Sequence, residues 1–272
     1  MTTMLFYEKP VPLNVDVHLK MRLAPSDGRV GFAANTNSIP LAAVEFLDAA
    51  REYPIVFTGK DGEALLPIVL VGVRHNENLC VTEDHRWDGR YLPAFVRRYP
   101  FVLAENRGGD DFNVYIDEAY PGFGESEGER LFTDDGEQTD FLKRALEFLS
   151  NYQGEIARTR MFVERLQSLD LLVPRVLDVT RSDEAPLVLQ GFSVIDEQRL
   201  VALGDAELLA LVRDGYLALI YSHLGSLGNV ARLSERLAAR LATPASVEGK
   251  AVAESVPQSK KKRSQGMATQ EA

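Results

Sequence analysis

A chain of 272 residues, of which 45% are hydrophobic and 26% charged, has the composition of a folded globular protein, which excludes a fibrous or wholly disordered one. Its formal net charge of −10 disfavours general binding to nucleic acid or anionic lipid. No apolar run approaches the roughly 18 residues of a membrane span, and the N-terminus lacks the features of a secretory signal. These properties predict a cytoplasmic protein whose single cysteine, Cys80, is a small buried hydrophobe.

Residues 10–135 carry the pattern of a β-rich region with one inserted helix. Short runs rich in Val, Ile and Phe, bounded by turn residues, predict strands at 30–34, 54–59, 67–73, 78–82, 100–105 and 112–117. Residues 108–111 separate the last two runs at hairpin distance. Ser38 is placed to cap the inserted helix, which would end before Pro54. Its apolar face would consist of Val44, Phe46, Leu47 and Ala50.

The pattern changes after Thr139 to the period of an α-helix that extends to Leu172. Gly154 lies near its middle and marks a possible bend. Apolar or small residues recur at steps of three and four, at Leu142, Ala145, Leu149, Tyr152, Ile156, Thr159, Val163 and Leu166. This seam favours packing against the β-rich part, and a coiled-coil partner is the alternative because the repeat is 3.5-periodic.

The rest of the chain is predicted to be mainly helical. Residues 186–203 suggest one or two short strands and a short helix, and Asp205 is placed to cap a helix that ends at Gly215. One last helix is predicted over 216–242, with His223 at the edge of its packed face. The predicted class is therefore α+β, with a β-rich domain over 1–138, a helical part over 139–242 packed on it, and a disordered tail over 243–272. A basic run at 260–263 offers a tether to an acidic partner, nucleic acid or membrane, although a solvated tail is favoured.

Local signatures of nucleotide, hydrolase, zinc-protease and redox sites are missing from the sequence. No cofactor is therefore expected. The weak alternative is a two-histidine, one-carboxylate site for non-haem iron, drawn from His18, His75 and His85 with Asp84 or Asp88.

The segment 87-WDGRYLPAFVRRYPFVLAE-105 holds the candidate binding residues Trp87, Tyr91, Arg97, Arg98 and Tyr99. Adjacent arginines diverge in a strand or a single helical turn, so one is expected to face inward and the other outward. An inward guanidinium needs a partner, for which Asp117 or Glu118 would serve while the arginine stacks on Trp87, Tyr91 or Tyr99. The alternative is recognition of a carboxylate or phosphate on a ligand or partner. The sequence leaves both alternatives open.

The chain resembles the SapC family of bacterial proteins. The resemblance rests on 10-PVPLNVDVHLKM-21, 53-YPIVF-57, 87-WDGRYLPAFVRRYPF-101, 131-LFTDDGE-137 and 223-HLGSLGNVARL-233. The family is named for an association with bacterial surface-layer (S-layer) proteins, and it implies no catalytic residues.

The missing catalytic motifs, the acidic chain and the surface-layer association of the family together favour a non-enzymatic binding or assembly protein with a protein partner, and the resemblance implies a link to cell-surface protein assembly or transport. A nucleic-acid partner is not expected, and a homo-oligomer stays open. The alternative is an enzyme or accessory subunit with a small-molecule site near Arg97 and Arg98, using His18, His75 or His85, with non-haem iron as one option.

Overall fold

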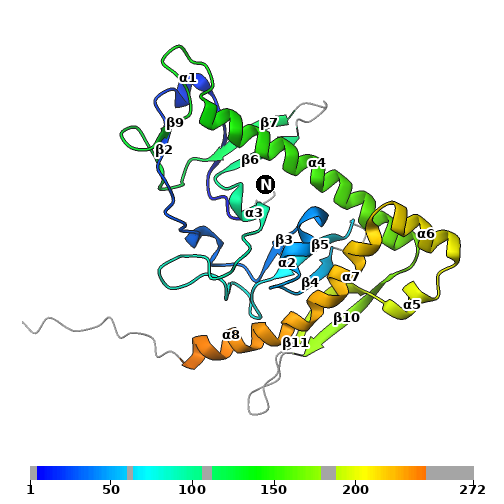
Figure 1. Ribbon diagram of the computed structural model, residues 1–272. Coiled ribbons are helices and arrows are strands. Elements are labelled where there is room, and N and C mark those ends of the chain that lie inside the picture. The colour runs from blue at the N-terminus through cyan, green and yellow to red at the C-terminus, as the bar shows by residue number, and fades with distance from the viewer. Residues whose placement is uncertain (1–4, 60–63, 106–111, 179–187, 243–272) are drawn as a thin grey trace, which may run out of the picture.

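The computed structural model describes residues 5–59, 64–105, 112–178 and 188–242 (Figure 1). It has an α+β fold, with sheets in the N-terminal part and a mainly helical C-terminal part, as predicted. The expected tail over 243–272, with its basic run at 260–263, lies outside the described residues.

The main sheet has five strands in the order β10-β11-β4-β5-β3, and every neighbouring pair is antiparallel. Its strands are β3 (Ser38–Pro40), β4 (Ile55–Thr58), β5 (Leu66–Leu70), β10 (Leu172–Asp178) and β11 (Val188–Ile195). Ser193 of β11 lies opposite Phe57 of β4. The sheet therefore contains strands from both sides of the boundary drawn at residue 138.

Two small antiparallel sheets extend the N-terminal part. One has the order β1-β7-β6, and the other has the order β8-β2-β9. Their strands are β1 (Pro10–Pro12), β2 (Arg22–Leu23), β6 (Phe101–Glu105), β7 (Phe112–Asp117), β8 (Phe123–Gly124) and β9 (Glu129–Arg130). The predicted hairpin of 100–105 with 112–117 is confirmed, because β6 and β7 pair along their length.

Helices cover both faces of the main sheet, whose side chains alternate between them. Ile55 and Phe57 of β4 belong to a core cluster that includes residues of α4 (Asp140–Ser168) and α7 (Tyr216–Ser226). Val56, between them, belongs to a second cluster, on the other face, completed by Leu233 and Leu237 of α8 (Val230–Ala242). In Figure 1, α4 runs diagonally from the small sheets to the C-terminal helices, and α8 lies along the opposite edge.

The long helix α4 confirms the predicted apolar seam. The Thr139 side chain accepts a hydrogen bond from the amide of Leu142 and so caps the helix. The helix continues unbroken through Gly154, so the bend suggested there does not divide it. Its first half packs on the β1-β7-β6 sheet and its second half on the main sheet, which accounts for the seam within this chain.

Two predicted strands of the N-terminal part are wrong. Residues 30–34 form a 3-10 turn, Gly31–Ala33, and residues 78–82 form turns with one isolated bridge between Val81 and Trp87. Asn78 explains the second error, since its amide donates to the Ala33 carbonyl and its oxygen accepts from the Cys80 amide. A side chain that bonds the local backbone competes with a strand ladder. Cys80 is nonetheless buried, as predicted.

The inserted helix is shorter than predicted and begins later. Ser38 belongs to β3 rather than to a cap, and the helix α2 (Phe46–Ala49) follows a 3-10 turn at Ala43–Glu45. Val44 and Leu47, expected on its apolar face, are exposed. The pairing of 38–40 with β5 overrides the local helix signal, because it completes the edge of the main sheet.

The C-terminal part also differs from its prediction. Strand β10 was not predicted. Pro174 lies within it, and an edge strand of a sheet tolerates proline. Helix α6 (Asp205–Arg213) has Gly204 rather than Asp205 at its N-cap, and it follows the predicted short helix α5 (Glu197–Val201). The single helix predicted over 216–242 is divided into α7 and α8 by a 3-10 turn at Leu227–Asn229. Within the described ranges, no helix is long and apolar enough to span a membrane.

Candidate functional site

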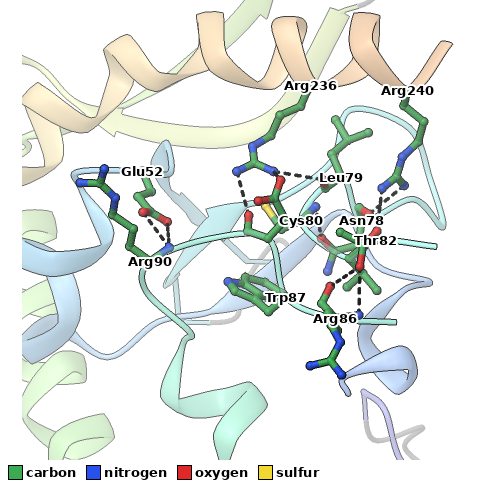
Figure 2. Close-up of polar contacts among 12 residues, drawn as sticks. Glu52, Asn78, Leu79, Cys80, Thr82, Arg86, Trp87, Arg90, Arg236 and Arg240 are labelled. Carbon is green, nitrogen blue, oxygen red and sulfur yellow. Dashed lines mark hydrogen bonds and ion pairs between the residues drawn. The ribbon is translucent and has the colours of Figure 1, made fainter. Parts of the chain in front are cut away.

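Trp87 begins the aromatic segment and is fixed from two sides. Its indole N–H donates to the Tyr53 hydroxyl at 3.1 Å and to the Tyr91 carbonyl at 3.0 Å. From α8, Arg236 forms an ion pair with Asp88 at 2.6 Å and donates to the Asp88 carbonyl (Figure 2). These contacts make Trp87 part of the framework rather than an exposed binding residue.

Tyr91 is held by the buried carboxylate of Glu45. The Tyr91 hydroxyl donates to Glu45 Oε1 at 2.7 Å, and the same oxygen accepts from the amide of Ala94 at 2.7 Å. The second oxygen accepts from the amide of Ala42 at 2.9 Å. Glu45 therefore ties the start of α3 (Ala94–Arg97) to the turn that precedes α2. The hydroxyl of Tyr91 is therefore part of the framework of the fold.

Tyr99 lies at the other end of α3 and bonds the carboxylate of Asp117. Its hydroxyl donates to Asp117 Oδ2 at 2.9 Å, and its ring stacks on Phe32 with 3.9 Å between centroids. Asp117 also accepts from the backbone amides of Glu8 and Lys9. Burial opposes ionisation of Asp117, but these hydrogen bonds outweigh it and lower the pKa of the carboxyl.

Arg97 and Arg98 diverge as expected, and Arg98 is the inward one. Arg98 is half-buried, with its guanidinium 3.9 Å from the ring centroid of Phe95 and 5.5 Å from that of Tyr152. Burial raises the pKa of Tyr7 to about 12, and the positive charge of Arg98 opposes that rise. Arg97 is exposed, and its guanidinium lies 5.4 Å from the ring centroid of Phe148. Arg98 is therefore stacked on aromatic faces.

The carboxylates expected to pair with these arginines are engaged elsewhere. Asp117 is used by Tyr99 and the backbone, and Glu118 pairs with Lys9 at 2.5 Å. Among the residues that the structure describes, neither Arg97 nor Arg98 forms an ion pair, and Arg98 Nε is buried without a hydrogen bond. The aromatic stacking partners also differ from the three that were predicted.

A pocket of about 280 Å³ lies where α3, β6 and α4 meet, and we call it the arginine pocket. Arg97 and Arg98 line it from one side and Arg144 of α4 from the other. The remaining lining residues are Leu23, Tyr99, Pro100, Phe101, Phe141, Ala145, Phe148 and Leu149. The lining thus combines three guanidinium groups with apolar walls and contains no acidic side chain. Such a surface is suited to a carboxylate or phosphate.

Phe141, Arg144 and Phe148 were missed because they lie away from the α4 seam, on positions that resemble a solvated face. Phe141, Arg144, Ala145 and Phe148 are spaced i, i+3, i+4 and i+7, which places them on one face of the helix. Two aromatic residues flanking an arginine at this spacing were the available signal. Only the position of α3 against this face identifies it as a pocket wall.

The three histidines of the alternative metal site lie in different parts of the fold. His18 is buried in α1 (Val15–His18), where its Nδ1 accepts from the amide of Asn14 at 3.0 Å. His75 is exposed after β5, and His85 is exposed in the turn that precedes Trp87. Over the described ranges, no group of three or more His, Cys, Asp or Glu side chains is arranged to hold a metal ion.

A family comparison bears on the same region of the chain. The model of the SapC family matches residues 13–233. This chain belongs to the SapC family. All residues that line the arginine pocket of this SapC protein lie within the matched range. No curated protein and no solved structure matches the chain.

The two arginines predict an asymmetric effect on stability. We expect Arg98→Ala to lower the free energy of unfolding by about 1–2 kcal/mol, because it removes the stacking on Phe95 and the packing of the side-chain stem. Arg97→Ala should change it by less than about 0.5 kcal/mol, as expected for an exposed side chain. Urea unfolding followed by circular dichroism measures both. Equal losses in the two variants would contradict the assignment of Arg98 as the inward residue.

Proposed function

We propose that this SapC protein is a non-enzymatic binding protein of the cytoplasm, which holds an anionic group of a protein partner in the arginine pocket. The observation that carries the proposal is the charge of the pocket. Arg97, Arg98 and Arg144 share it without an acidic lining residue, in a chain whose formal net charge is −10. Three cations that share one pocket repel each other, and a bound anion would relieve that repulsion.

The chemistry of the lining supports a defined kind of ligand group. A guanidinium offers paired N–H donors that match a carboxylate or phosphate, and the apolar walls reduce competition from water. The volume of about 280 Å³ is at the small end for ligand sites, which favours one side chain or chain end over a large cofactor. A carboxylate or phosphate attached to an apolar group fits both features.

The family adds the biological setting of the proposal. SapC proteins are named for an association with bacterial surface-layer proteins, and the sequence lacks the local signatures of nucleotide, hydrolase, zinc-protease and redox sites. We therefore infer a role in the assembly or transport of cell-surface protein, with the protein partner contributing the anionic group.

Partner recovery from native bacterial extract tests the proposal. The double variant Arg97→Ala/Arg144→Ala removes two exposed arginines of the pocket, and Arg213→Ala removes an exposed arginine of α6 as a matched control. We expect wild type and the Arg213 variant to retain a partner identified by mass spectrometry. The amount of that partner recovered with the double variant should be at least tenfold lower. Recovery should also fall with salt.

Two results would count against the proposal. Equal partner recovery by the double variant would exclude the arginine pocket as the contact. Recovery of wild type as a lone monomer under gentle conditions would argue against a binding protein altogether. Stoichiometric metal in untagged protein would instead support the alternative of an iron-dependent enzyme or accessory subunit, because that alternative includes a metal ion bound by histidines.

A further inference from the structure

A second pocket, of about 650 Å³, lies on the other side of Tyr99 from the arginine pocket, and we call it the aromatic pocket. It is formed by the N-terminal segment around Phe6, the loop over 24–32 and the turn over 119–122. Its volume is within the range of roughly 300–1,000 Å³ that is typical of small-molecule sites. Tyr99 is the one lining residue that it shares with the arginine pocket.

One wall of the aromatic pocket is a continuous series of rings. Phe6 meets Phe32 edge to face at 5.4 Å, Phe32 stacks on Tyr99 at 3.9 Å, and Tyr99 meets Tyr120 edge to face at 5.2 Å between centroids. Rings that hold one another in this way form a rigid platform. Binding of a ligand to this platform costs little conformational entropy, because these side chains are already ordered.

The rest of the lining supplies exposed polar side chains. Within the described part of the chain, no hydrogen bond or ion pair is made by the side chains of Glu8, Asp27, Arg29, Asn35 or His85. Two of the five are acidic, one is a guanidinium, one is an amide and one is an imidazole. The lining therefore offers both donors and acceptors while its charges nearly balance.

The backbone of the aromatic pocket is held in uncommon conformations. Phe6, Asp27 and His85 have φ angles of 80°, 50° and 63°. Two other non-glycine residues in the described ranges, Asn76 and Asp170, have a positive φ, and neither lines this pocket. A positive φ is unfavourable for a bulky residue such as Phe6, and such conformations gather at binding sites where the surrounding structure enforces them.

We propose that the aromatic pocket binds the ring of a neutral saccharide. The C–H face of a sugar ring stacks on an aromatic platform, and its hydroxyls donate to the carboxylates and accept from Arg29 and Asn35. The balanced charge disfavours a strongly anionic ligand, and Arg29 disfavours a quaternary ammonium cation. The saccharide site is argued from Asp27, Arg29 and Asn35, which do not line the arginine pocket, so it does not depend on the proposed partner function.

Saturation-transfer NMR of the full chain tests this site, with glucose, galactose, mannose and N-acetylglucosamine as probes at millimolar concentration. We expect transfer to the ring protons of at least one of the four. The double variant Asp27→Asn/Arg29→Ala should reduce that transfer at least fivefold, because it replaces a charged carboxylate by a neutral amide with only one acceptor oxygen and removes a guanidinium donor from the lining. Asparagine tolerates a positive φ, so the loop conformation is kept. Arg213→Ala serves as the control and should match wild type.

Each outcome decides the proposal. Transfer that is lost in the Asp27/Arg29 variant, with a wild-type circular dichroism spectrum, supports the site. No transfer from any of the four sugars overturns it, as does equal transfer in the variant. Adenosine serves as a comparison probe, and transfer to its base protons with none to the sugars would assign the ring platform to base stacking and overturn the saccharide class. The partner-recovery experiment uses other residues, so the two results are independent.

Discussion

Replacing Glu45 with alanine is expected to lower the free energy of unfolding by about 3–5 kcal/mol. Glu45 is 4% exposed and accepts three hydrogen bonds, from the amides of Ala42 and Ala94 and from the hydroxyl of Tyr91. Alanine leaves these donors without an acceptor, and each buried unsatisfied donor costs about 1–3 kcal/mol. Tyr91 is half-buried, so in the variant its hydroxyl can donate to water in place of Glu45, which recovers part of the lost free energy.

Urea unfolding of Glu45→Ala at neutral pH measures this loss. Glu45→Gln keeps the oxygen that serves Ala94 and Tyr91 but faces Ala42 with an amide donor, so an intermediate loss of about 1–2 kcal/mol is expected. Glu83→Ala is the matched control, since Glu83 is exposed. A loss below about 1 kcal/mol in Glu45→Ala would show that this carboxylate does not hold α3 in place.

His223 is expected to make the stability depend on pH between about 6.5 and 4. The side chain is fully buried in α7, and its Nε2 accepts a hydrogen bond from the Ile195 amide at 3.0 Å. Burial lowers the pKa of His223 from 6.5 to about 4, against a smaller opposing contribution from the backbone of Ile55. The folded state therefore keeps the imidazole neutral at pH values where the unfolded chain protonates it.

The sign of the effect follows from which state takes up the proton. Below pH 6.5 the unfolded state binds a proton at His223 and the folded state does not. The free energy of unfolding therefore falls as the pH is lowered from about 6.5 to about 4. The lowering corresponds to roughly 3 kcal/mol at about 1.4 kcal/mol for each pH unit. The lowered pKa of Asp117 adds its own loss at lower pH, below the ordinary value of 3.8.

Denaturant unfolding at several pH values between 7 and 4 checks the prediction. His223→Gln retains a side-chain acceptor for the Ile195 amide but does not titrate, so its stability should be nearly flat over this window even if its value at pH 7 is lower. His75→Gln replaces an exposed histidine and should keep the wild-type pH dependence. A wild-type slope in His223→Gln would assign the dependence to other groups.

The elements that the sequence predicted well are those in which many residues agree on one pattern. Helix α4 was predicted because its apolar seam repeats over eight positions, and the β6–β7 hairpin because two alternating runs flank a turn. The short runs at 30–34 and 78–82 had similar composition but no strand partner. Their backbone groups are satisfied by turns and by Asn78 instead.

The candidate site divides in the same way. The sequence alone determined the α+β class, the aromatic segment and the divergence of Arg97 and Arg98, because these follow from composition and local geometry, and its motifs carried the resemblance to the SapC family. The tertiary structure decided that Arg98 is the inward residue, that Arg144 joins the pair, and that Asp117 is taken by Tyr99. The reason is physical: a pocket forms between elements distant in the chain, and the partner of a buried charge depends on which elements pack together.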